Sequence, residues 1–400
     1  MDLRTPYPYA LLRHGIINSY PSLDNNIKAD IAIIGAGISG ALLADRLLRA
    51  GYDVVVADRR HAGTGSTAAS TSLLQYEIDT PLYKLIDLVG KKTAVASYKL
   101  CRKAIYDLEK ICSRLNGPGL FEKKPSFQFA SFKKDVDDLQ KEYELRRQEG
   151  FDVSLFGQDD VQNKFGFSSP AGLFSSDGAI ADAYLLTHRL LSKNISKGLR
   201  VYDNTEITHI RYQKRGVELQ TADKKKILAR KLVIACGYES QKYVPKKIQD
   251  NHATFAIASE PFQHKNFWYK NAMIWETARP YLYLRTTSDN RIIAGGRDIP
   301  FSNPKQRDRM LSEKAKSIER SIEKLFPEIL FKTDFKWAGT FAATRDGLPY
   351  IGSIPERPNT YFALGFGGNG ITFSVIATQI IHHLLRGIKN QAANMFRFDR

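Results

Sequence analysis

The feature that most restricts the fold of this chain is a glycine-rich segment near its beginning. Residues 31–40 read IAIIGAGISG, an apolar stretch that runs into Gly35, Gly37 and Gly40 and then into the helical pattern ALLADRLLRAG. The sequence VVVAD follows and ends at Asp58. This order predicts a strand, a glycine turn, a helix and a second parallel strand, the βαβ unit that binds dinucleotides.

The three glycines have different expected roles in this unit. Gly35 permits the tight turn, Gly37 lets the backbone approach a pyrophosphate, and Gly40 lets the helix pack closely on the strand. The pyrophosphate is expected at the helix N-terminus, where Ile38 and Ser39 stand and where unpaired N–H groups favour anions. The ligand must therefore carry an ADP moiety.

Asp58 is placed to accept a hydrogen bond from the adenosine ribose. The motif alone does not separate FAD from NAD. NADP fits least well, because a carboxylate at the ribose opposes a 2′-phosphate, although Arg59 and Arg60 follow directly.

Composition limits the remaining classes of protein. A length of 400 residues suggests two domains. The net charge of +17 comes from 59 basic and 42 acidic residues spread along the chain. This favours a basic solvated surface over a functional field that recruits acidic substrates, nucleic acid or an anionic surface. The apolar stretch 31–44 is too short for a membrane span, and no secretory signal precedes it, so we expect a cytoplasmic protein.

The three cysteines, Cys101, Cys112 and Cys236, lack CxxC spacing. They predict neither a disulfide framework nor a cysteine zinc site, and we expect no metal. Cys101 and Cys112 belong to an amphipathic helix over 93–115 and are expected in its core.

Other segments are assigned by their patterns. The small and hydroxylic residues 63–79 predict a loop close to a flat ligand. We expect strands at 124–132, 199–210 and 231–236, several strands within 251–300, and helices over 133–148, from Asp182 onward and over 304–325. His188, on the helix that follows Asp182, is expected to be structural.

One strand within 251–300 carries candidate substrate contacts. Tyr281, Tyr283 and Arg285 alternate with Leu282 and Leu284, so the two sets lie on opposite faces. We expect the first set to form the wall of the substrate site, and a half-buried sheet face is the equally weighted alternative. Further along the predicted flavin loop, Gln75, Tyr76 and Glu77 are weaker candidates.

A second glycine-rich segment lies in the C-terminal part of the chain. NTYFALGFGGNGITFSVIATQIIHHLL predicts a strand, a loop over 365–370 and a long apolar helix whose N-terminus points at a ligand. Cys236 and Gly237 end another strand at a glycine turn. Glycine-rich junctions at both ends of the chain predict one cofactor site with a second domain inserted between them.

These segments resemble FAD-dependent oxidoreductases of the D-amino acid oxidase superfamily, in the branch of glycine, sarcosine and γ-glutamylputrescine oxidases. IAIIGAGISG, STAASTSLL, LVIACG, RDGLPYIG and ALGFGGNGI carry the resemblance over roughly residues 28–390. It implies a mixed α/β fold, with a Rossmann-like FAD-binding domain and an interleaved substrate domain on an antiparallel sheet. The expected FAD-binding domain comprises 28–90, 170–248 and 336–400, the substrate domain 91–169 and 249–335, and 1–27 is an extension.

The resemblance also implies where FAD lies. The adenosine is expected beside Asp58 and Arg59, with the main chain of Ile207 at the adenine. The flavin ring is expected between two groups of residues: Thr67, Ala68, Ser70, Thr71 and Ser72 on one side, and Gly367, Gly368, Asn369, Gly370 and Ile371 on the other.

The sequence departs from this branch at three places. Phe341 and Gly368 stand where glycine oxidase-like members carry arginines that grip the substrate carboxylate, so a free α-amino acid is not the expected substrate unless Arg285 or Arg297 replaces that grip. No cysteine stands near Gly339 to tether the flavin. We therefore expect noncovalent FAD.

The implied reaction is hydride transfer from the α-carbon of an amine or amino-acid derivative to flavin N5, followed by hydrolysis of the imine. No side-chain base is required, and none is recognisable. The electron acceptor, O2 or another molecule, stays open. Two rivals are a flavoenzyme acting on a modified tRNA base, which the absence of an RNA-binding motif disfavours, and a noncatalytic FAD-binding protein.

Overall fold

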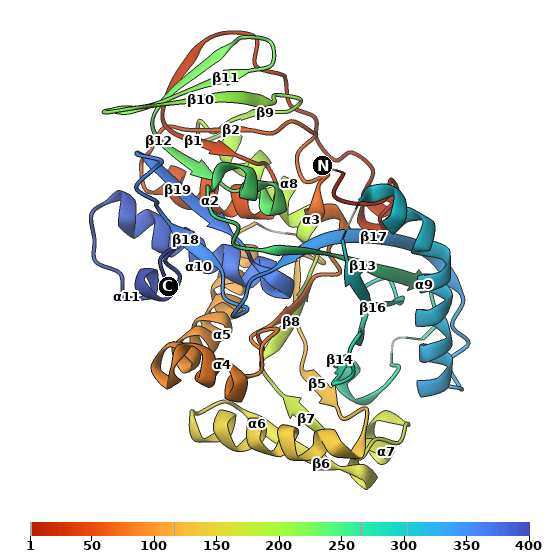
Figure 1. Cartoon of the computed structure of the whole chain (residues 1–400). Coiled ribbons are helices and arrows are strands. Elements are labelled where there is room, and N and C mark those ends of the chain that lie inside the picture. The colour runs from red at the N-terminus through yellow and green to blue at the C-terminus, as the bar shows by residue number, and fades with distance from the viewer. Residues whose placement is uncertain (1, 116, 265, 302) are drawn as a thin grey trace.

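The computed structural model describes residues 2–115, 117–264, 266–301 and 303–400. Its strands form two large sheets, one at the top of Figure 1 and one at its lower right, and a small three-stranded sheet. Helices pack against both large sheets. The mixed α/β class that the sequence predicts is confirmed.

The first large sheet is built on the predicted βαβ unit. Its strand order is β10-β11-β12-β1-β2-β9, and β19 pairs with both β12 and β18. Its strands are β1 (Ile27–Ile34), β2 (Val54–Ala57), β9 (Arg200–Tyr202), β10 (Ile207–Gln213), β11 (Gly216–Thr221), β12 (Lys226–Ile234), β18 (Tyr350–Gly352) and β19 (Thr360–Leu364).

Three parallel strands of this sheet end at one edge. In the pairing register, Ile34 of β1 lies opposite Ala57 of β2 and Ile234 of β12. The turns that follow these residues therefore emerge side by side, at the carboxyl ends of the strands, where open parallel sheets bind ligands.

The second large sheet has the order β17-β13-β16-β15-β14-β5-β7-β6. Neighbouring strands are antiparallel except β14 and β5, which are parallel. Its strands are β5 (Ser126–Phe129), β6 (Val153–Gly157), β7 (Ala171–Ser175), β13 (Asp250–Ser259), β14 (Met273–Glu276), β15 (Leu282–Thr286), β16 (Ile292–Pro300) and β17 (Thr333–Ala343). β17 spans the expected boundary between residues 335 and 336, and β7, just after the expected boundary between residues 169 and 170, pairs with β5 and β6. The division into two domains stays a prediction.

The small sheet has the order β3-β8-β4 and consists of β3 (Leu73–Gln75), β8 (Gly178–Ala181) and β4 (Phe121–Lys123). The N-terminal segment is attached to the second large sheet. Thr5 N donates to Ala338 O at 3.0 Å and Thr340 N donates to Leu3 O at 2.9 Å, so this segment lies along β17.

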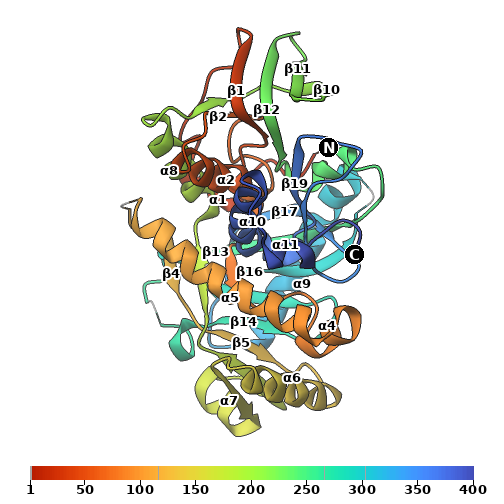
Figure 2. The same ribbon diagram turned by 90° about the vertical axis from the view of Figure 1, so that its left-hand side faces the viewer.

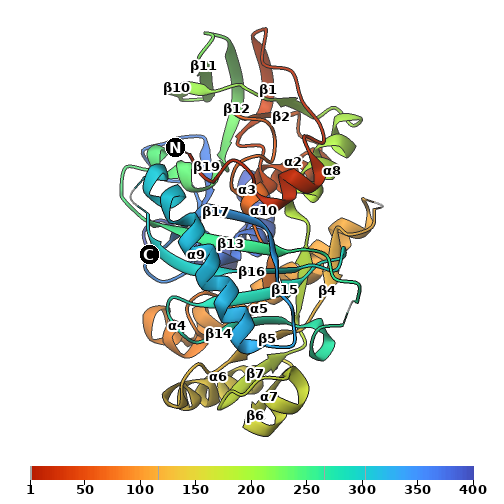
Figure 3. The same cartoon turned by 90° about the vertical axis from the view of Figure 1, so that its right-hand side faces the viewer.

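Helices cover the sheets on distinct faces. In Figure 2, α10 and α5 face the viewer, and α10 packs between α2 and α5. In Figure 3, α9 crosses the second sheet over β13 and β16. The α-helices are α1 (Tyr9–His14), α2 (Ile38–Arg49), α3 (Ser66–Ala69), α4 (Leu82–Val89), α5 (Lys91–Ser113), α6 (Val136–Gln148), α7 (Gln158–Phe165), α8 (Ala183–Ile195), α9 (Pro304–Leu325), α10 (Gly370–Leu385) and α11 (Gln391–Met395). The short 3-10 helices are η1 (Lys133–Asp135), η2 (Gly237–Tyr243), η3 (Tyr269–Asn271) and η4 (Gly367–Asn369).

Most expected elements occur where their patterns place them. The amphipathic segment forms α5, with Cys101 and Cys112 buried in the core, and Asp182 caps α8 by accepting from Leu185 N at 2.9 Å. His188 is buried edge-on against Tyr184, and burial lowers its pKa to about 4. Segment 63–79 differs from the expected loop, because it contains α3 and β3.

None of the helices in the described part of the chain is long and apolar enough to cross a membrane.

Candidate active site

The nucleotide-binding loop has the geometry that its glycines predict. Gly35 follows β1 with φ of +112°, a conformation that side chains disfavour. A Cβ atom there would lie 2.6 Å from Ala235 O, and a Cβ atom at Gly40 would lie 1.8 Å from Gly35 O. The close packing of α2 on β1 therefore requires glycine at both positions.

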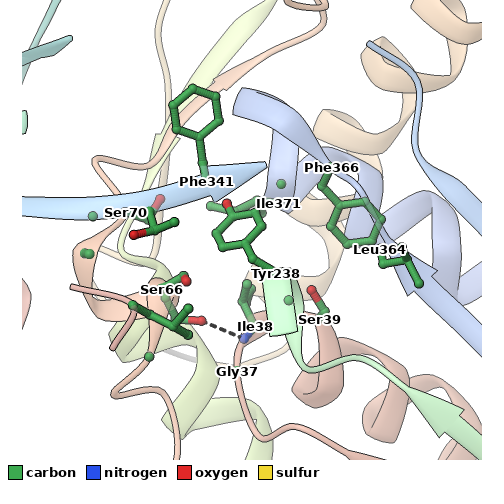
Figure 4. Close-up of a pocket in the computed structure, with 18 of the residues that line it drawn as sticks. Gly37, Ile38, Ser39, Ser66, Ser70, Tyr238, Phe341, Leu364, Phe366 and Ile371 are labelled. Carbon is green, nitrogen blue, oxygen red and sulfur yellow. Dashed lines mark hydrogen bonds between the residues drawn. The ribbon is translucent and has the colours of Figure 1, made fainter. Parts of the chain in front are cut away.

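The first turn of α2 faces a cavity. Thr67 of α3 accepts a hydrogen bond from Ile38 N at 3.0 Å, which fixes α3 against this turn (dashed in Figure 4). Gly37, Ile38 and Ser39 line the cavity. The positive end of the helix dipole and the N–H groups of this turn other than that of Ile38 make it suitable for a pyrophosphate.

Asp58 lies at the end of β2 and lines the same cavity. Its carboxylate accepts from Ala36 N at 2.8 Å and from Arg60 N at 2.9 Å, so it also fixes the glycine loop. Burial raises its pKa. Arg59 and Arg60 both pair with Glu239 of η2, at 2.5 and 3.1 Å.

The cavity encloses about 300 Å³ and extends from Asp58 to the second large sheet. The expected cofactor residues that line it are Gly35, Gly37, Ile38, Ser39, Asp58, Arg59, Thr67, Ser70, Thr71, Ser72, Ile207, Cys236, Gly237, Gly367, Gly368, Asn369, Gly370 and Ile371. Gly40 and Ala68 lie behind this surface and serve packing.

The two glycine-rich regions are joined directly. Asn369 Nδ2 donates to Gln75 O at 3.1 Å and to Glu77 O at 2.8 Å, and Gly368 N donates to the Asp79 carboxylate at 2.8 Å. Gln75 and Glu77 line the cavity, whereas Tyr76 is buried against Phe151 instead.

Tyr281 and Tyr283 form part of the opposite wall. Their ring centroids lie 5.9 Å apart, and the Thr71 hydroxyl lies 3.3 Å from that of Tyr283. Burial raises the pKa of Tyr283 to about 12, so its hydroxyl stays protonated near neutral pH and can donate a hydrogen bond.

Arg285 does not line this cavity, contrary to its expected place in the substrate wall. Its Nε donates to Thr71 O and its Nη1 donates to Thr286 O at 3.2 Å. It shares a strand face with Tyr283 but stands two residues farther along, beneath the Thr67–Ser72 segment. There it borders a separate space of about 40 Å³.

Arg297 also points elsewhere. Its guanidinium donates to Pro280 O at 2.8 Å and to Ser321 of α9 at 2.6 Å, and it pairs with Glu276 at 3.4 Å. Neither arginine considered from the sequence therefore reaches the cavity to grip a carboxylate.

Several cavity residues were missed by the sequence analysis. Tyr238, Trp275 and Thr254 line the cavity, and Asp79 projects into it. Figure 4 shows Tyr238 in the same space as Ser70, Phe341 and Ile371. Tyr238 follows the recognised Cys236-Gly237 turn and Asp79 ends the recognised loop, so proximity to these motifs was the available signal.

The comparisons with known proteins agree with this geometry. The sequence model of the family described as FAD dependent oxidoreductase matches residues 30–384. The chain belongs to the FAD-dependent oxidoreductase family. The resemblance found in the sequence is thereby confirmed, and FAD is the cofactor of this family.

Among its relatives, this FAD-dependent oxidoreductase is similar to the gamma-glutamylputrescine oxidoreductase of Escherichia coli K12, with 24% identity over 92% of this chain and 86% of that protein. Its fold is shared with glycine oxidase from Geobacillus kaustophilus, at a TM-score of 0.77 and 19% identity over 91% of this chain and 96% of that one. It is shared likewise with L-proline dehydrogenase from P. horikoshii, at a TM-score of 0.79 and 19% identity over 94% and 99% of the chains.

The residues present fit FAD. The cradle at Gly35 leaves no room for a side chain, the α2 N-terminus faces the cavity, and the N-terminus of α10 faces it from the other side through Gly370 and Ile371. Within the described residues, Cys236 is the cysteine that lines the cavity, and burial raises its pKa to about 12, which disfavours the thiolate.

Proposed function

We propose that this enzyme oxidises a carbon–nitrogen bond of an amine or amino-acid derivative. The observation that carries the proposal is the continuity of one cavity from the α2 N-terminus to the aromatic wall at Tyr281 and Tyr283. A small substrate bound against this wall lies next to the segments that would hold the flavin. Relatives named for glycine, D-amino acids and gamma-glutamylputrescine support the same reaction class.

Different residues would hold the parts of the cofactor. Asp58 and the main chain of Ile207 would hold the adenosine, and the first turn of α2 would hold the pyrophosphate. The Thr67–Ser72 segment and the Gly367–Ile371 turn would hold the flavin ring, noncovalently. FAD supplies the hydride acceptor when bound.

The protein's own residues would orient the substrate and exclude water. The Tyr283 hydroxyl, protonated at neutral pH, would donate a hydrogen bond, and Tyr281 and Phe341 would present apolar ring faces. The positive N-terminal end of α10 would stabilise negative charge that develops beside it. The amine reacts as the neutral base, and the imine product is hydrolysed after release.

The test is anaerobic mixing of the purified yellow protein with primary amines, N-methyl amino acids, D-amino acids and γ-glutamyl amines. Loss of flavin absorbance with one class is the expected result. A yellow protein that none of them reduces would refute amine oxidation and redirect attention to the tRNA-base alternative, which the family comparisons do not favour.

The electron acceptor is tested on the same preparation. Photoreduced protein is mixed with air-saturated buffer: rapid return of the flavin absorbance identifies an oxidase, and return only after addition of an artificial acceptor identifies a dehydrogenase. A cytoplasmic location also stays a prediction, and the three free thiols support it.

A further inference from the structure

Asp79 places a carboxylate at the substrate end of the cavity. This residue lies between β3 and α4, and its carboxylate is open to the cavity. One of its oxygens accepts from Gly368 N at 2.8 Å. Burial in the cavity wall raises its pKa, while the Gly368 N–H and the charges of Arg279 and His252 act in the opposite direction.

The position of the Asp79 carboxylate leaves little room for side chains at positions 367 and 368. A Cβ atom at Gly368 would lie 2.7 Å from Asp79 Oδ1, and one at Gly367 would lie 2.6 Å from Asp79 Oδ2. A side chain at position 368 would therefore require the Asp79 carboxylate to shift.

The rest of this end of the cavity suits a cation. Tyr238, Trp275, Tyr281 and Phe341 line it with aromatic rings, whose faces attract ammonium groups. A second carboxylate, that of Asp298, interacts with the Tyr281 side chain, and its pKa is raised by burial and also by the charge of Asp79.

Arg279 carries a nearby positive charge that would oppose the binding of a cation. It is exposed and lines the same cavity, with its guanidinium 4.9 Å from the centre of the Tyr281 ring. Among the described residues it forms no ion pair with Asp79. The Asp79 carboxylate is thus left open for a ligand on its cavity side.

We propose that the substrate enters as an organic cation without a carboxylate on the carbon that bears the reacting nitrogen, and that Asp79 is the counter-ion that selects it. The reacting nitrogen then loses its proton to solvent, because hydride leaves only the α-carbon of the neutral amine. This inference rests on the proposed amine oxidation and narrows it to amines that are not α-amino acids. Asp79 is then a specificity-determining residue, and its hydrogen bond to Gly368 N positions it beside the flavin turn.

Two unreactive probes test the charge preference of the loaded enzyme. Tetramethylammonium and glycine betaine carry the same type of quaternary nitrogen, and only betaine has the α-carboxylate. Neither nitrogen has a free electron pair, so neither supports hydride transfer. Binding is followed by the change in the visible spectrum of the bound flavin and by the thermal midpoint, at constant ionic strength.

We expect tetramethylammonium to bind at least about tenfold more tightly than betaine. Asp79→Asn keeps an oxygen that can accept from Gly368 N but removes the charge. It should weaken the binding of tetramethylammonium by about tenfold or more. Asp79→Glu should retain most of the affinity. Asp87→Asn, which removes an exposed carboxylate of α4, should leave binding unchanged.

Equal or tighter binding of betaine to the unmodified enzyme would overturn the proposal, as would no binding of tetramethylammonium or an Asp79→Asn variant that binds it normally. These outcomes are independent of amine oxidation. If amines reduce the flavin but betaine binds best, oxidation stands and the role of Asp79 is wrong. If the charge preference holds but no amine reduces the flavin, the proposed reaction is wrong.

Discussion

Single residues determine whether the cofactor loop can form. In a Gly40→Ala variant, a Cβ atom with ideal geometry would lie 1.8 Å from Gly35 O, which is far too close. We expect the FAD dissociation constant to rise by about 10- to 100-fold, because this overpacking costs about 1–3 kcal/mol at the cradle. Titration of the apoprotein with FAD, followed by flavin fluorescence, measures this.

Gly157→Ala is the matched control for this change. A Cβ atom at Gly157 meets no atom within 4 Å, and the residue has an ordinary φ of −80°. FAD affinity should be unaffected there. Equal losses in both variants would mean that general destabilisation, and not the loop, is responsible.

Arg285 provides a second prediction at this scale. Because its guanidinium holds Thr71 O and Thr286 O, Arg285→Met should loosen the Thr67–Ser72 segment. We expect FAD affinity to fall by about tenfold, while the apparent KM for substrate at saturating FAD changes by less than about twofold. A large rise in KM with normal FAD affinity would show instead that Arg285 contacts the substrate.

At the scale of elements, a buried charge cluster joins three segments. Arg146 of α6 pairs with Glu142 at 2.6 Å and with Glu77 at 3.4 Å. Glu142 in turn accepts from Leu82 N and Tyr83 N at the start of α4, at 3.0 and 3.2 Å. The cluster thus connects α6, α4 and the segment that leads to Asp79.

Arg146→Met should lower the free energy of unfolding by about 3–5 kcal/mol, because it leaves two buried carboxylates without their cation. Urea unfolding measures the change. Arg147→Met, at an exposed position of the same helix, should change stability by less than about 0.5 kcal/mol. Similar values for the two variants would contradict the importance of the cluster.

Elements with a strong local signal could be predicted from the sequence. α9 spans Pro304–Leu325 as expected, since Asn303 caps it and proline suits its first position. α3 was missed because STAA has no apolar periodicity. Contacts made after folding fix it, including Thr67 with Ile38 N and the Trp337 indole with Ala69 O at 2.9 Å.

The residues of the candidate site also divide into those that the sequence predicts and those that it does not. The cofactor residues lie in contiguous motifs, so most of them were recognised. Asp79 meets Gly368 only through the tertiary fold, and no local pattern reports a contact over that separation. Arg285 was misplaced because strand alternation gives the face of a side chain but not the point at which the cavity ends.

At the scale of the whole molecule, both ends of the chain attach to one region. Leu3 and Thr5 pair with β17, and Arg400 forms an ion pair with Asp346, just beyond β17, at 2.8 Å. The Arg400 guanidinium also lies 3.8 Å from the centre of the Tyr350 ring. The terminal segments therefore reinforce the strand that carries Phe341.

The Asp346–Arg400 pair should make stability depend on pH. Burial alone would raise the pKa of Asp346, but the hydrogen bond and charge of Arg400 lower it below its usual range. Asp346→Asn should cost about 2 kcal/mol at neutral pH. The difference should persist down to the unfolded pKa of roughly 3.9 and shrink as the pH falls through the lower folded pKa.

Urea unfolding at several pH values checks this dependence. Asp399→Asn, which removes a neighbouring exposed carboxylate paired with Arg397, should show little effect at any pH. If the loss of unfolding free energy in Asp346→Asn stays constant down to strongly acidic pH, the variant has lost packing and not a charge interaction.

The hydrogen bonds of Asn369 to Gln75 O and Glu77 O have a consequence for biosynthesis. Gly35 and Asp58 are translated long before Asn369, so the contacts that close the flavin turn cannot form until residue 369 has left the ribosome. A nascent chain that has reached Pro358 still lacks β19, the neighbour of β12, as well as α10. FAD loading therefore follows the synthesis of α10, and translation products that end at Pro358 should remain colourless.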